Sequence, residues 1–141
     1  MDRCRQTARH IARACGVFPR VEPALHEIDF GDWSGLSFKE LDPDPEWARW
    51  NTDRDHVRPP GGETMLEVQC RLSDWLERVR ENAPAAVVAV SHADVIKAAA
   101  CLALGLTIRA HDRFAVDPGS ITTLVMGGWG MKLHSLNEVP R

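Results

Sequence analysis

The chain has 141 residues, and 17 Lys and Arg against 20 Asp and Glu give it a formal net charge of −3. Hydrophobic residues make up 44% of the chain and charged residues 26%, the balance of an ordinary globular domain. We therefore expect a single domain over residues 1–141. The mild acidity excludes a general nucleic-acid coat. The longest apolar runs are far shorter than the roughly 18 residues that cross a bilayer, so no membrane partner is expected.

The cysteines and histidines do not form metal-binding patterns. No two of the four cysteines, Cys4, Cys15, Cys70 and Cys101, make a CxxC pair. A domain with a full core does not need disulfides, so we expect reduced thiols and a cytoplasmic location. The histidines form no HxH or HxxxH pair, and the glycine patterns of nucleotide-binding loops are absent. The sequence therefore predicts neither a metal nor a cofactor.

The first predicted element is an amphipathic helix over residues 2–15, which Gly16 ends. One face consists of Thr7, Ala8, Ile11, Ala12 and Cys15. The opposite face carries Arg5, Arg9 and Arg13. A short extended piece is expected around residues 20–22. Because the predicted helix precedes this piece, the chain opens on a helix rather than on a strand.

Residues 26–62 are rich in glycine and proline and predict a long, mostly irregular excursion. Within it, Asp44 followed by Pro45 indicates the start of a short helix. Tryptophans gather in this region, and we expect them to pack the loop rather than to line a pocket. They are Trp33, Trp47 and Trp50.

The second half alternates helices with strands. Thr64 and Glu67 form a capping box that opens a helix ending near Pro84. Residues 86–90 are a short valine-rich run, typical of a strand buried on both faces. A helix over residues 94–104 follows, and two strand-like runs around Gly127-Gly128 predict a hairpin. This order indicates an α/β sandwich with a mainly parallel sheet and an antiparallel edge.

His92 stands where the predicted buried strand meets the next helix. At such an edge the free N–H groups of a helix N-terminus favour a phosphate, to which an imidazolium could donate. A structural histidine that caps the strand explains the position equally well. His10 lies in mid-helix without a strand before it, and we expect it on the surface.

Three further residues are candidates for phosphate chemistry. Glu27 lies between apolar neighbours before a glycine turn, where a raised pKa would suit a general acid, although position alone favours a solvent-facing side chain. Arg3 stands at the start of the first helix and could present a bidentate fork to a phosphate. Glu63 either lines a pocket or sits in the first turn of its helix, and the second interpretation is preferred.

Taken in order, these segments resemble the histidine phosphatase superfamily, also called phosphoglycerate mutase-like. The matching stretches are residues 3–8 (Arg-Cys-Arg-Gln-Thr-Ala), 25–35, 59–64 (Pro-Pro-Gly-Gly-Glu-Thr) and 87–92. The resemblance runs from Met1 to about Leu136, and the third stretch looks most like the small phosphatases of the family. It implies a three-layer α/β sandwich of the phosphoglycerate mutase type, without its first strand and helix.

The resemblance also implies roles for individual residues. The family hydrolyses phosphomonoesters through a phosphohistidine intermediate, on phosphorylated small molecules and without a metal. Arg3 then matches a phosphate ligand, Glu27 the general acid/base, and His92 the second histidine, which holds the phosphoryl group. Where the family usually has glycine after that histidine, this chain has Ala93, whose backbone N–H remains available to a phosphate.

One departure from the family pattern is large. The Arg-His-Gly motif that supplies the nucleophile does not occur in this sequence. We therefore expect a histidine phosphatase whose 141-residue form lacks its nucleophile and is inactive alone. The alternatives are a non-catalytic phosphate-binding or assembly module, completed by a strand-donating partner or a second copy, and a phosphoglycerate mutase-type phosphotransferase.

Overall fold

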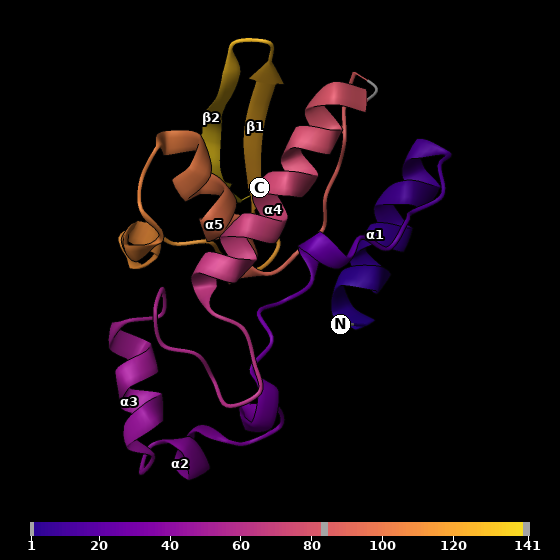
Figure 1. Cartoon of the computed structure of the whole chain (residues 1–141). Helices are drawn as coiled ribbons and strands as arrows, with labels where there is room; N and C mark the ends of the chain where they lie inside the picture. Colours follow the sequence, from indigo (N-terminus) through magenta and orange to yellow (C-terminus); the bar gives the residue numbers. More distant parts are fainter. Residues whose placement is uncertain (1, 83–84, 140–141) are drawn as a thin grey trace.

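The computed structural model describes residues 2–82 and 85–139. Figure 1 shows its helices and its hairpin. The α-helices are α1 (Asp2–Cys15), α2 (Phe38–Leu41), α3 (Pro45–Thr52), α4 (Met65–Asn82) and α5 (Ala93–Leu104). Short 3-10 helices are η1 (Pro23–Leu25), η2 (Gly31–Trp33) and η3 (Ile108–Asp112). The strands are β1 (Ile121–Gly127) and β2 (Gly130–Glu138).

Helix α4 is the central element of the core, and its predicted capping box is confirmed. The Glu67 backbone N–H donates to Thr64 Oγ1 over 3.2 Å, and the Thr64 N–H donates to Glu67 Oε2 over 2.8 Å. This pair satisfies N–H groups that the helix leaves free at its start. The apolar stripe behind it buries Met65, Val68 and Leu72 to 1% exposure or less.

Helix α5 packs against α4, and the hairpin packs against α5 (Figure 1). Ala98 and Ala100 are fully buried, and such small side chains let the neighbouring elements approach closely. The helix ends as predicted at Gly105, whose φ of 64° lies in the left-handed region that favours glycine. This packing fixes the start of α5, where His92 lies, relative to α4.

The tryptophans of the 26–62 region pack against one another, as predicted. Asp44 caps α3 by accepting from the Glu46 N–H over 2.8 Å. Trp50 is 1% exposed and stacks on Trp47 with ring centroids 5.3 Å apart. Trp33 meets both rings edge-on. A small aromatic core therefore holds this excursion together.

The predicted mainly parallel sheet is wrong for the described residues. Their only sheet is the antiparallel hairpin of β1 and β2. Its turn is shifted by one residue from the prediction, because Gly127 and Gly130 pair across it. Residues 86–90 are neither helix nor strand, and Val88 is 67% exposed. A strand buried on both faces needs hydrogen-bonded neighbours, and no other described segment pairs with this run.

Helix α1 has the predicted bounds but not the predicted burial. Ala12 is its only buried residue, and Ile11 and Cys15 are exposed. Figure 1 shows α1 beside the α4–α5 layer rather than inside it. An apolar helix face is buried only where another element covers it, and the described elements cover little of this one.

Composition led us to expect reduced thiols and no membrane-spanning helix. Cys4, Cys15, Cys70 and Cys101 are free thiols. None of the described helices combines the length and the apolar character that a bilayer crossing requires.

Two loops meet backbone to backbone at Gly62. The Glu63 N–H donates to the Asp29 carbonyl over 2.9 Å, and the Asp32 N–H donates to the Pro60 carbonyl over 2.8 Å. A Cβ added to Gly62 would lie 2.3 Å from the Asp29 oxygen, closer than real Cβ contacts. Glycine at this position therefore lets the loop that carries Glu27 join the start of α4.

Gly62→Ala is expected to lower the free energy of unfolding by about 2 kcal/mol or more, because the new methyl group collides with backbone rather than with a flexible side chain. The matched control is Gly128→Ala, where a Cβ meets no atom within 4 Å. The control should stay within about 0.5 kcal/mol of the parent chain in urea denaturation followed by circular dichroism. Equal stability of both variants would contradict the close approach.

Candidate active site

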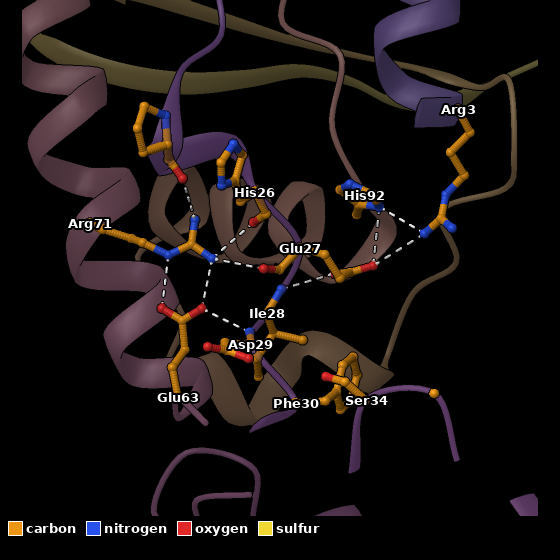
Figure 2. Close-up of a pocket in the computed structure, with 12 residues that line it drawn as sticks. Arg3, His26, Glu27, Ile28, Asp29, Phe30, Ser34, Glu63, Arg71 and His92 are labelled. Atoms are coloured by element: carbon orange, nitrogen blue, oxygen red, sulfur yellow. Dashed lines mark hydrogen bonds and ion pairs between the residues drawn. The ribbon is translucent and has the colours of Figure 1, made fainter. Parts of the chain in front are cut away.

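Three side chains from separate segments meet at one point. Arg3 lies at the start of α1, Glu27 in the loop after η1, and His92 just before α5. Arg3 Nη2 is 2.9 Å from His92 Nδ1 and 3.8 Å from Glu27 Oε2. Glu27 Oε2 is 3.2 Å from His92 Nδ1 (Figure 2). The three residues to which the resemblance assigns roles at one phosphoryl group therefore lie together.

His92 is positioned by the start of α5. It is the N-cap residue, with φ −109° and ψ 158°, and its side chain is 4% exposed. The preceding residue, Ser91, donates its hydroxyl to the Leu25 carbonyl over 2.7 Å. This bond ties the segment of His92 to the segment of Glu27. Ala93 is the first residue of α5, so its N–H is among those that the helix leaves free for another acceptor.

The contacts of His92 indicate a neutral ring. A guanidinium only donates, so Nδ1 accepts from Arg3 and the ring proton is assigned to Nε2, which lies 3.4 Å from Cys4 Sγ. Burial lowers the pKa of His92, and the neighbouring Arg3 charge lowers it further. Both effects disfavour the imidazolium form of His92 in the chain by itself.

Glu27 has the opposite shift. Burial raises its pKa, and the charge of Asp94 adds to the effect; the Ile28 N–H, Arg3 and Arg71 offset it in part. The side chain is 26% exposed, so the solvent-facing alternative is wrong. An upward shift of the pKa of a carboxyl group favours its protonated form, the form that a general acid needs.

A cavity of about 820 Å³ opens beside these groups. Arg3, Glu27 and His92 line it together with the less polar Ile28 and Phe30. The Arg3 side chain is 73% exposed, so it can present donors to a ligand in this space. The arrangement offers a cation, a proton donor and an imidazole to one anionic group.

Comparison with known proteins shows the family of the chain. The sequence profile of the histidine phosphatase superfamily (branch 1) matches residues 1–139. The chain belongs to this superfamily. Phosphoserine phosphatase 1 of Hydrogenobacter thermophilus is 33% identical over 123 residues, which cover 85% of this chain and 58% of that protein. The chain thus spans little more than half the length of this curated relative.

Solved structures of histidine phosphatases show the same fold in part. One is a mycobacterial glucosyl-3-phosphoglycerate phosphatase in complex with inorganic phosphate, which matches with a TM-score of 0.82 at 26% identity. The match covers 97% of this chain and 73% of that phosphatase chain. The α-ribazole phosphatase of Shigella flexneri has a TM-score of 0.86 at 23% identity, covering 100% and 72%. The phosphoglycerate mutase-like fold is therefore present over about 70% of its usual extent.

Two residues of this histidine phosphatase cavity have positions that the sequence did not predict. Glu63 precedes α4 and lines the cavity, so its preferred assignment to the first helical turn is wrong. It pairs with Arg71, whose Nε lies 2.9 Å from Glu63 Oε1. Sequence spacing would pair Arg71 with Glu67 four residues earlier, but Glu67 pairs with Arg58 instead. No local sequence signal could have shown that Arg71 pairs with Glu63 rather than with Glu67.

Another cluster of polar groups lies away from this site. Ligand atoms of Asp53, Asp55 and His56 lie within 4.8 Å of one another. The guanidinium of Arg109 lies on both carboxylates, 3.0 Å from Asp53 and 2.7 Å from Asp55. A cation of the chain itself therefore offsets part of the negative charge of this cluster. His10 is on the surface, as predicted.

The His92 ring should titrate with a midpoint below the ordinary value of 6.5 in NMR spectra of its Cε1–H. Arg3→Gln should move the midpoint upward, because it removes the adjacent positive charge. Arg5→Gln, an exposed arginine of the same helix, is the matched control and should leave the midpoint in place. A midpoint insensitive to Arg3→Gln would disprove the contact.

Proposed function

We propose that this chain carries the phosphate-handling part of a phosphomonoester hydrolase that works through a phosphohistidine. The observation that supports it is the meeting of Arg3, Glu27 and His92 within 3.8 Å. Arg3 would hold two phosphoryl oxygens, while the ring N–H of His92 and the backbone N–H of Ala93 would donate to others. The substrate would be a phosphorylated small molecule, the class that the names of the relatives indicate.

Glu27 would act twice in this reaction. As the P–O bond to the alcohol breaks and a P–N bond to the nucleophilic histidine forms, the protonated carboxyl gives its proton to the leaving oxygen. The resulting carboxylate then takes a proton from the water that attacks the phosphohistidine. Throughout, the Arg3 charge offsets the negative charge on the transferring group.

The nucleophile itself is proposed to lie outside these 141 residues. The sequence contains no Arg-His-Gly motif. Within residues 2–82 and 85–139, no second imidazole has a hydrogen bond or ion pair with Arg3, Glu27 or His92. The isolated chain would then bind phosphate without turning over an ester.

Phosphate binding tests the anion site directly. Titration of the chain with inorganic phosphate by calorimetry should give saturable binding, and Arg3→Ala should weaken it about 10- to 100-fold, the equivalent of about 1.5–3 kcal/mol for a hydrogen bond to a charged group. Arg5→Ala is the control and should bind as the parent chain does. Equal binding by both variants would contradict the proposed role of Arg3.

Turnover tests the position of the nucleophile. The isolated chain should release no more p-nitrophenol from p-nitrophenyl phosphate than buffer does, since the proposed nucleophilic histidine that would form the P–N bond is not among its residues. The release is followed by absorbance. Clear turnover that is abolished by replacing one histidine of this chain would overturn the assignment.

A binding or assembly module is the second candidate, and the exposed run at residues 86–90 favours it. Val87 is 47% exposed and Val88 is 67% exposed. A strand from another chain that pairs with this run would remove these apolar side chains from water. A strand from a second copy would make the chain a dimer. Light scattering that shows only monomer at high concentration would count against this candidate.

A further inference from the structure

Arg71 of α4 faces the chain segment that carries Glu27. Its Nε and Nη2 each lie 2.9 Å from one carboxylate oxygen of Glu63, a bidentate pair (Figure 2). Both side chains are largely covered, with 23% of Arg71 and 21% of Glu63 exposed. Bidentate pairing fixes the plane of the guanidinium and so the direction of its remaining N–H groups.

Those remaining N–H groups hold the backbone beside Glu27. Nη1 donates to the Ala24 carbonyl over 2.6 Å, and Nη2 donates to the His26 carbonyl over 2.8 Å. Longer contacts of 3.4 Å reach the carbonyls of Pro23 and Glu27. The carbonyl between the two strong bonds, that of Leu25, is held by the Ser91 hydroxyl. Consecutive carbonyls on one side of Glu27 are therefore all fixed.

Glu63 fixes the other side of Glu27. Its Oε2 accepts from the Asp29 N–H over 3.0 Å, while its own N–H donates to the Asp29 carbonyl over 2.9 Å. The Glu27 backbone thus lies between two anchored stretches, and its carboxyl points to His92 and Arg3 (Figure 2).

Arg71 lines the cavity, where a guanidinium could also bind a phosphate directly. A guanidinium has five N–H donors. The contacts to Glu63 and to the 23–27 carbonyls engage its three nitrogens. Little donor capacity is left for a phosphate. Arg3, by contrast, is 73% exposed.

We infer that Arg71 and Glu63 are positioning residues, whose ion pair clamps residues 23–29 so that the Glu27 carboxyl is held against His92 Nδ1. This inference rests on the proposed function, since it assigns the clamp to the placement of the proposed acid. The clamp acts through geometry rather than through its charge. Lysine keeps the charge of Arg71 but cannot make the fork and reach the carbonyls at the same time.

The test is a double-mutant cycle read on the NMR titration of the His92 Cε1–H. Glu27→Gln should shift the His92 midpoint in the parent chain, because their polar atoms lie 3.2 Å apart. The same substitution should shift it by less than half as much in Arg71→Gln and in Arg71→Lys. The direct effect of the Arg71 charge on His92 is common to both arms of each cycle and cancels, and Arg71→Lys keeps the effect of that charge on Glu27.

Arg58→Gln is the matched control. Arg58 also pairs with a glutamate at the start of α4, Glu67, but is not among the groups that hold residues 23–29. The full Glu27→Gln shift should persist in it. Should Arg71→Gln fail to fold, Glu63→Gln replaces it, since glutamine keeps the shape of the side chain and weakens the fork.

An undiminished shift in folded Arg71→Gln, or in Glu63→Gln, would overturn the inference. A diminished shift in Arg71→Gln that Arg71→Lys restores in full would overturn the geometric account as well. Failure of the parent chain to bind inorganic phosphate would instead contradict the proposed function, and the cycle can still be read in that case.

Discussion

The structure of the site depends on how one exposed cation affects two partly buried titratable groups. Burial raises the pKa of Glu27 and lowers that of His92, and Arg3 lowers the pKa of His92 further. Both shifts favour the uncharged forms. A less charged Glu27 compensates the positive charge of Arg3 less, which suits the capture of an anion.

The three groups are not all positioned by the hydrophobic core. His92 and Glu27 lie on segments that the core holds, whereas Arg3 lies on a helix that the core hardly contacts. Helices α4 and α5 share a core with the hairpin, and they fix His92 and the loop of Glu27. Arg3 lies on α1, which buries only Ala12. The contact of Arg3 with His92 and Glu27, together with that of Cys4, is therefore a main attachment of α1 to the rest of the site. Ligand binding at Arg3 would strengthen this attachment, since an anion shared by both sides stabilises the state in which they meet.

Much of the local structure could be predicted from the sequence because its causes are local. The capping box at Thr64, the proline after Asp44 and the glycine after α5 all act within a few residues, and the structure confirms each of them. The parallel sheet could not be predicted from residues 86–90, because a valine-rich run becomes a strand only where another strand pairs with it. The choice between Glu63 and Glu67 as the partner of Arg71 likewise depends on how two loops meet.

By itself, the sequence predicted the longer helices α1, α3, α4 and α5, and the motifs that bring an arginine, a carboxylate and an imidazole into the family order. It also determined the family to which the chain belongs. Only the tertiary structure decided the direction of the pKa shift of His92, the burial of Glu27 and the contacts of Arg71 with residues 23–29. The physical reason is range: caps and periodicity act over one or two helical turns, whereas desolvation and ion pairing depend on which distant segments are packed together.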